Sequence, residues 1–243
     1  MRLTSKVAAV MLVAMAGLVL SAPVSSAEWF ADMFAGVSLT QSHDVTIHDP
    51  IVGQGVYKDT DFSTNAAYGM RVGRYFDSLP FLGLALDYFS FSPNIAPQGT
   101  QREGCMLVTG CGTFEGHTGR IDIQVRSISL DLMLRLPLFK TDKVPNGLVQ
   151  PYLSLGAPMF ITTVTPRTSL QFRNQHDETS VSVGGKGAAG VSVQIFSNLN
   201  LFGEYRFTHT NTNVDLESAV VRTASFDTTF NTHSLLMGLS ARW

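Results

Sequence analysis

The sequence is poor in the features that mark several large protein classes. It has two cysteines among 243 residues, and charged residues make up 15% of the chain, with 17 basic against 19 acidic side chains. Without an excess of Lys and Arg, the chain lacks the electrostatic footprint of a nucleic-acid-binding protein. Beyond the first 27 residues it also has no apolar run of the roughly 20 residues that a membrane helix needs. We therefore expect no nucleic acid as a partner and no helical membrane domain.

The first 27 residues have the composition of a secretory signal peptide. A positively charged start precedes an apolar run over 7–20, and small residues at 25–27 offer a cleavage site. Because the apolar run is short for a bilayer span, cleavage is favoured over a membrane anchor. Removal of 1–27 leaves 15 basic against 19 acidic residues, a net charge of −4. The remaining 28–243 are expected to form one all-β domain, since barrels of 200 to 250 residues are often single units.

Apolar residues alternate with polar or small ones in eight segments. In 125–136, for example, leucines and isoleucines at even positions alternate with serines, Asp131 and Arg135 at odd positions. A period of two predicts β-strands with two different faces. The expected strands cover 33–41, 66–76, 82–88, 125–136, 151–158, 185–195, 201–208 and 234–243.

The connections between these strands alternate in length. The segments 42–65, 92–122, 164–184 and 209–231 are long and polar, whereas the other links are short, as at Ser197-Asn198 or in the turn at 145–147. Short periplasmic turns facing long extracellular loops are typical of transmembrane barrels. The sequence therefore predicts an all-β fold, an eight-stranded antiparallel up-and-down β-barrel with both chain ends in the periplasm.

Periodicity alone leaves open which face of the sheet meets solvent, so a soluble periplasmic lipid-binding barrel is an alternative. Two features favour the membrane version. The less apolar face mixes Gly and Ala with charges of both signs, which suits a narrow, filled lumen. Aromatic residues flank the apolar faces, as expected of the girdles at the two membrane interfaces. These girdle candidates are Tyr68, Tyr88, Tyr205, Phe207 and Trp243.

The last two strands carry a resemblance to a known family. The final strand alternates to an aromatic end, like the C-terminal assembly signal of outer-membrane barrels, in which Phe is the commoner last residue. Its apolar face holds Leu235, Met237, Leu239, Ala241 and Trp243. The segment 201–208, LFGEYRFT, resembles the penultimate-strand Glu-Tyr-Arg-Tyr pattern of OmpA-like and opacity-type surface barrels.

This resemblance implies a location in the outer membrane, with membrane lipid and the barrel-assembly machinery as partners. It also implies a monomer without a cofactor. The implied role is structural, adhesive or one of recognition, with the long loops binding a host or cell-surface ligand, since binding residues usually lie on loops. The alternative function is a narrow porin-like channel for ions or small solutes.

Seven charged residues fall on the expected inner face. They are Arg71, Asp87, Asp131, Arg135, Lys186, Glu204 and Arg206. Because unpaired buried charges are very costly, we expect a network that joins the acidic members to the arginines. Such a network either plugs the barrel or, by exchanging partners, gates a narrow ion path.

Other reactive residues indicate neither catalysis nor metal binding. Cys105 and Cys111 lie close together in an exported chain and predict a disulfide that staples a loop. With His117 they do not complete a zinc site. His233 adjoins Ser234, but neighbours on a strand point to opposite faces. Lipid A deacylase barrels place their His and Ser two residues apart, so we expect no enzyme and no metal.

Overall fold

The computed structural model describes residues 28–49, 53–106, 110–118, 120–141, 144–166, 178–216 and 224–243, which form one antiparallel β-sheet. The predicted signal peptide, 1–27, lies outside these residues. The strands are β1 (Trp29–Thr40), β2 (His43–Asp49), β3 (Gly53–Thr60), β4 (Asn65–Tyr75), β5 (Leu82–Phe91), β6 (Gln98–Met106), β7 (Gly110–Thr118), β8 (Ile121–Arg135), β9 (Val149–Pro166), β10 (Glu178–Phe196), β11 (Leu199–Leu216) and β12 (Ala224–Arg242).

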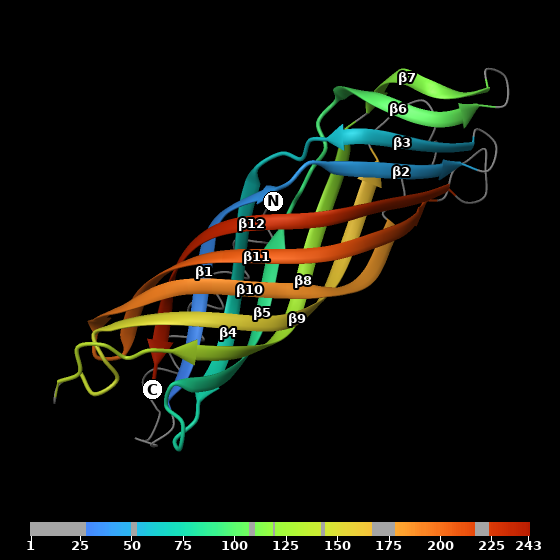
Figure 1. Cartoon of the computed structure of the whole chain (residues 1–243). Coiled ribbons are helices and arrows are strands. Elements are labelled where there is room, and N and C mark those ends of the chain that lie inside the picture. The colour runs from blue at the N-terminus through green and yellow to red at the C-terminus, as the bar shows by residue number, and fades with distance from the viewer. Residues whose placement is uncertain are drawn as a thin grey trace, which may run out of the picture.

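Eight of these strands close into a barrel (Figure 1). Their order is β1-β4-β5-β8-β9-β10-β11-β12, and pairing of β12 with β1 completes the ring. Each strand pairs with the next along the chain once the four additional strands are set aside, as in an up-and-down barrel. The predicted eight-stranded antiparallel barrel is confirmed.

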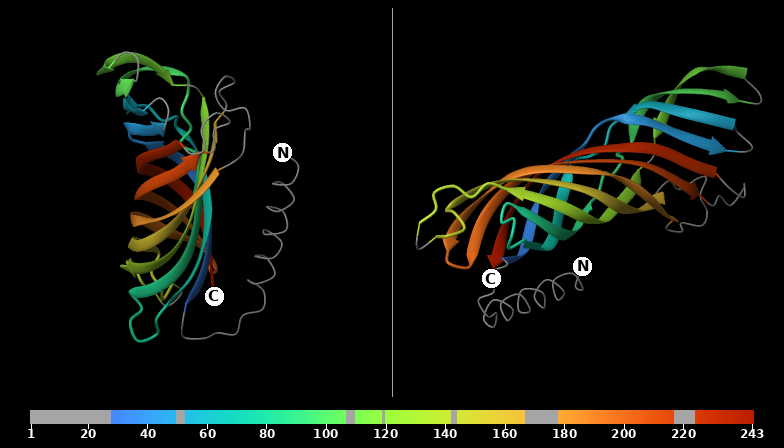
Figure 2. Two further views of the ribbon diagram at one scale, coloured as in Figure 1. Left: turned by 90° about the vertical axis from the view of Figure 1, so that its right-hand side faces the viewer. Right: turned by 60° about the horizontal axis from the view of Figure 1, so that its bottom comes forward.

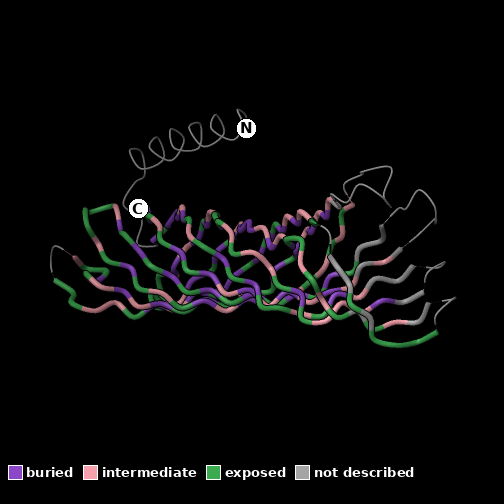
Figure 3. The backbone as a smooth tube through the Cα atoms, turned by 90° about the horizontal axis from the view of Figure 1, so that it is seen from above, coloured by how far each residue is buried: buried purple, intermediate pink, exposed green. Residues whose placement is uncertain are grey.

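The apolar faces of the barrel strands point outward. Leu86, Leu130, Leu155 and Met237 have 59%, 64%, 61% and 66% of their surface exposed, while the alternate residues on the same strands are largely buried. Figure 3 shows this alternation of buried and exposed residues along the strands. A closed barrel with such an outer belt is stable in lipid rather than in water. The soluble lipid-binding barrel is therefore wrong, because it would bury these faces.

In the part of the chain that the structure describes, no helix is long and apolar enough to span a bilayer.

The segments predicted as long loops contain much of the extra strand structure. β2, β3, β6 and β7 fall inside 42–65 and 92–122, and β9 to β12 extend to 18 or 19 residues each. The outer end of β12 pairs with β2, and the sheet then continues through β3 and β6 to β7 (Figure 2). We name these four strands the extracellular sheet. Its β6 and β7 lack apolar alternation, so periodicity did not reveal them.

The opposite end of the barrel has short turns and holds both ends of the described chain. The backbones of Trp29 and Trp243 exchange two hydrogen bonds, of 2.8 and 3.1 Å. The predicted turns at 145–147 and 197–198 are present, and Gly147 adopts a left-handed φ of 84° that favours glycine. This short-turn end corresponds to the periplasmic side of outer-membrane barrels.

Large aromatic rings fill the lumen, in contact with inward-facing glycines on neighbouring strands. A Cβ atom on Gly69 would lie 2.6 Å from the Phe34 ring, and one on Gly190 would lie 2.5 Å from the Tyr152 ring. Glycine on the inner face therefore makes room for rings. The sequence predicts aromatic residues in outer girdles, and these inner rings are a finding of the structure.

Candidate functional site

Glu204 on β11 lies at the centre of the lumen and binds three side chains. Arg71 on β4 donates to it at 2.5 Å, Arg206 Nε at 2.9 Å and the Tyr152 hydroxyl at 2.8 Å. Both guanidinium groups stack near aromatic rings, with Arg206 4.8 Å from the Phe34 centroid. These contacts hold the Glu204 carboxylate in one position.

Asp87 on β5 connects this centre to the next strands. It accepts two hydrogen bonds from Arg206, at 3.1 and 2.9 Å, and lies 3.0 Å from the Lys186 ammonium. Lys186 on β10 also pairs with Asp131 on β8 at 2.5 Å. Two-point binding of a carboxylate by arginine fixes its orientation as well as its charge. The barrel strands thus bring six of the seven predicted charges into one central cluster.

Arg135, the seventh predicted residue, lies apart from this central cluster. It pairs with Glu28 at the periplasmic end, where Arg242 also binds Glu28 at 2.8 Å. The expectation that Arg135 joins the other six is wrong, because its position at the end of β8 places it on their periplasmic side. We call Glu28, Arg135 and Arg242 the periplasmic cluster.

Sequence reasoning missed three charged members of the lumen. Asp32 contacts Arg71 Nε at 3.4 Å in the central cluster, and Glu28 and Arg242 belong to the periplasmic cluster. Asp32 has the inward parity of β1 but precedes the predicted strand start at Met33. Extending that strand by one residue would have found it.

Positive and negative charges balance along the described lumen. The cations are Arg71, Arg135, Lys186, Arg206 and Arg242, and the anions are Glu28, Asp32, Asp87, Asp131 and Glu204, five of each. The central cluster holds three cations and four anions, and the periplasmic cluster two cations and one anion. Matching charges lowers the cost of burying ions out of water. The described lumen charges therefore sum to zero.

The extracellular half of the lumen is closed by apolar side chains. Phe91, Ile123, Phe160 and Phe230 are each at most 1% exposed and belong to one buried cluster in the outer halves of their strands. Hydroxyl pairs line the space between this apolar plug and the charges, for example Ser38 with Ser234 at 2.7 Å. The apolar plug therefore lies on the extracellular side of the charged clusters.

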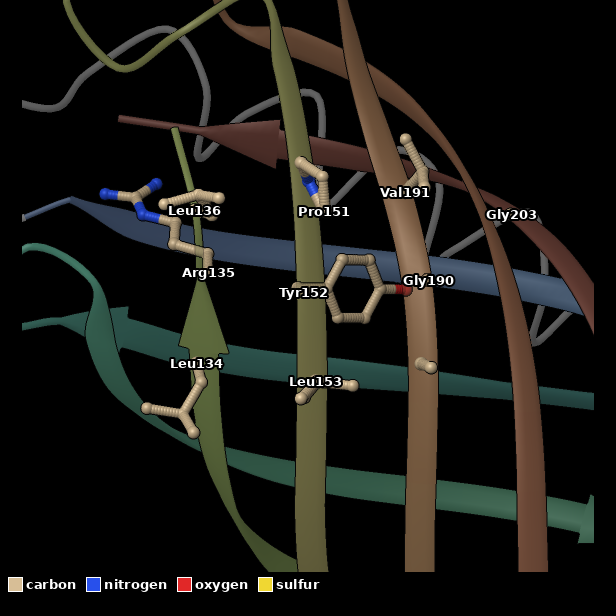
Figure 4. Close-up of a pocket in the computed structure, with 10 residues that line it drawn as sticks. Leu134, Arg135, Leu136, Pro151, Tyr152, Leu153, Gly190, Val191 and Gly203 are labelled. Atoms are coloured by element: carbon tan, nitrogen blue, oxygen red, sulfur yellow. The ribbon is translucent and has the colours of Figure 1, made fainter. Parts of the chain in front are cut away.

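A hollow of about 660 Å³ lies on the outer wall of the barrel, along β8 to β11 (Figure 4). Leucines, Val191 and Gly203 line the hollow, and the Tyr152 ring extends toward Gly190 on the neighbouring strand. Because the hollow belongs to the apolar belt, membrane lipid covers it. It is not a solvent-exposed ligand pocket.

Ion pairs connect neighbouring strands of the extracellular sheet. The Lys58 ammonium on β3 lies 3.0 Å from an Asp44 carboxylate oxygen on β2 and 3.5 Å from Glu103 on β6. The hydrogen bond from Lys58 lowers the pKa of Asp44 below its usual value, and the Asp59 backbone amide donates to the same carboxylate. The contacts link three neighbouring strands outside the membrane.

The outermost strand, β7, ends the sheet. Among the described residues its only strand neighbour is β6, and their register places Cys105 directly opposite Cys111. The disulfide itself stays a prediction.

His233 and Ser234 point to opposite faces of β12. The Tyr205 hydroxyl lies 2.6 Å from His233 Nδ1 on the outside, whereas Ser234 bonds Ser38 on the inside. Among the described residues, no group of three or more His, Cys, Asp or Glu side chains is placed so that it could hold a metal ion. Of the residues in the C-terminal assembly signal, Leu235, Met237 and Leu239 face outward, whereas Ala241 is buried. Their role in assembly stays a prediction.

Comparison with known proteins identifies the fold. No protein-family model and no curated protein matches the chain. Among solved structures, the outer membrane protein OprG from Pseudomonas aeruginosa is similar, with a TM-score of 0.52 at 15% identity over 88% of this chain and 95% of OprG. Neisserial surface protein A matches 89% of this chain and 97% of its own, at 15% identity and a TM-score of 0.46. The chain has the fold of the small outer-membrane β-barrels.

Proposed function

We propose that this protein is a surface recognition or adhesion protein, in which the extracellular sheet binds and the barrel anchors. Its partner is an extended protein segment on a host or neighbouring cell surface. Outer-membrane lipid surrounds the belt, the barrel-assembly machinery inserts the chain, and the protein acts as a monomer without a cofactor. The filled lumen supports a rigid anchor rather than a channel.

The observation that carries this proposal is the edge of β7, which has no second strand neighbour among the described residues. Soluble and surface proteins usually protect an edge strand with Lys, Pro or a bulge, since its open backbone groups can pair with another chain. The nine residues of β7 contain neither Lys nor Pro, and the β6–β7 register shows no bulge. An extended peptide can add to such an edge by main-chain hydrogen bonds.

Proline substitution tests the edge directly. Neighbouring residues of an antiparallel strand direct their amides to opposite sides, so one of Thr113 and Phe114 donates toward β6 and the other toward the open edge. Replacing each singly by Pro yields one variant with a damaged β6–β7 ladder and one with only a blocked edge. We expect both variants to lose binding.

Binding is measured with cells displaying the full-length protein, on immobilised fibronectin and on cultured epithelial cells. A variant in which a Gly-Ser linker replaces 98–118 gives the complete loss for comparison, and the heat-dependent gel shift verifies barrel folding. If wild-type cells bind no better than cells without the protein, or if the linker variant binds as well as wild type, the recognition role is refuted.

The channel alternative is tested separately by single-channel recording of residues 28–243 in a planar bilayer. A closed anchor is expected to give a silent bilayer. Reproducible conductance steps that change in Glu204→Gln would instead make the lumen the functional site. Catalysis is not proposed, because the adjacent His233 and Ser234 lie on opposite faces of the wall.

A further inference from the structure

A small cavity separates the central cluster from the periplasmic cluster. Its volume is about 10 Å³, and its polar lining includes Asp32, Ser240 and Arg242. Phe30, Tyr75, Met133, Tyr152 and Phe202 are among the side chains around it. A cavity of this size is about the smallest that holds one water molecule.

Three polar atoms of the lining make no hydrogen bond of standard geometry in the structure, although Ser240 lies close enough to the Asp32 carboxyl group to interact with it. They are Asp32 Oδ1, Ser240 Oγ and Arg242 Nε. Asp32 and Ser240 are 6% and 2% exposed, so bulk water does not satisfy them. Leaving a buried polar group without a partner is costly. Three such groups around one cavity point to a ligand.

Strand register explains why these atoms converge. Asp32 on β1 is the direct cross-strand partner of Ser240 on β12, and both side chains face the lumen. Arg242 follows Ser240 by two residues and therefore lies on the same face. Its Nη atoms are occupied by Glu28, Gln150 and Ser192, which leaves Nε toward the cavity.

We propose that one structural water molecule occupies this cavity and binds all three atoms. The Asp32 carboxylate is an acceptor, the Arg242 Nε–H is a donor, and the Ser240 hydroxyl is both. Water accepts from Nε–H, donates to the carboxylate and pairs with the hydroxyl in either sense. The Arg242 guanidinium disfavours a metal cation in this cavity, and the Asp32 carboxylate disfavours an anion. Neither kind of ion therefore matches the three polar atoms.

The water joins two clusters of opposite formal charge. Among the described residues, the central cluster has one more anion than cation, and the periplasmic cluster one more cation than anion. The bridge lies between Asp32 of the first and Arg242 of the second, which makes the ion networks a single hydrogen-bonded unit. The hydrogen-bonded network then extends without interruption from Glu28 in the periplasmic cluster to Asp131 in the central cluster.

A crystal structure of refolded 28–243, at a resolution that shows ordered water, tests this proposal. We expect one water within hydrogen-bond distance of Asp32 Oδ1, Ser240 Oγ and Arg242 Nε. In Ser240→Val the added methyl group occupies the cavity, so the water is expected to disappear. Ser234→Val serves as the matched control, because Ser234 faces the lumen on the same strand but bonds Ser38; this variant should retain the water.

Three results would overturn the proposal. They are an empty cavity, direct bonding of Asp32 to Ser240 or Arg242 Nε in place of the water, and density or anomalous signal from an ion. If Ser240→Val does not fold, water-to-amide NOEs of the wild-type protein in micelles provide the second readout. A cross peak between a long-lived water and the amides around Asp32 and Ser240 supports the site, and its absence refutes it.

Discussion

Replacing Glu204 by Gln is the sharpest perturbation of the lumen. The substitution keeps the size of the side chain but removes the charge that Arg71 and Arg206 share. One of the two Glu204 carboxylate oxygens is replaced by an amide nitrogen, which faces a guanidinium donor and does not accept a hydrogen bond from it. The balance of five cations and five anions becomes an excess of one buried positive charge.

The expected loss of stability is large. Breaking a fully buried ion pair by removing one partner costs about 3–5 kcal/mol, because the remaining charge stays out of water. The Glu204 side chain is 0% exposed and Arg71 is 1% exposed, so solvent does not screen the change. At about 2 kcal/mol per M of urea, the unfolding midpoint is expected to fall by roughly 1.5–2.5 M.

Reversible urea unfolding in lipid vesicles measures this shift, followed by tryptophan fluorescence and by the heat-dependent gel shift. Glu115→Gln is the matched control, because Glu115 is exposed on β7 and its change should stay within about 0.5 kcal/mol. A midpoint for Glu204→Gln within error of wild type would refute the view that the network stabilises the barrel. A wild-type midpoint together with new conductance would assign the network to gating.

Three further predictions concern packing, the lipid belt and the extracellular sheet. Gly69→Val should prevent barrel closure, because its Cβ would meet a backbone oxygen at 2.2 Å, whereas Gly203→Val has no atom within 4 Å and should give a normal gel shift. Leu130→Arg places a charge in the lipid-facing belt. It should lower the free energy of unfolding in vesicles by about 2–4 kcal/mol, the cost of a cation at the bilayer midplane. An unchanged free energy of unfolding would contradict the outward orientation of the belt. Lys58→Met should raise the pKa of Asp44 in an NMR titration, because its hydrogen bond is removed. The stabilisation by this pair is present above the usual Asp pKa and is lost as pH falls through the lowered value; an unchanged Asp44 pKa would refute the coupling.

The barrel strands were predictable from the sequence because lipid selects one face so strictly. Along β8, Ile128, Leu130 and Leu132 are exposed and alternate with buried Ser127 and Ser129, whereas nearer the extracellular end Ile123 and Val125 are buried instead. The charged lumen followed from the same parity. Short strand boundaries were the main error, and they excluded Asp32 from the predicted network.

The extracellular sheet was not predictable in the same way. Above the membrane neither face of β6 or β7 is selected by lipid, so polar residues and glycines occupy both parities. The inner aromatic residues were hidden for a different reason. Phe34 and Phe202 fit the lumen only because Gly69 and Gly238 on neighbouring strands leave them space, and that pairing depends on register.

The division of the molecule follows from where each part can satisfy its backbone and its charges. Inside the belt, strand pairing is closed, ten charges are matched and aromatic rings occupy the remaining space. Few groups are left there to bind anything larger than water. Outside, the sheet ends at β7 with its open edge supported by β6, β3 and the long β12. A rigid barrel fixes the position of that edge relative to the membrane, so the binding that we propose at β7 would not need to order a flexible loop, whose immobilisation would reduce affinity.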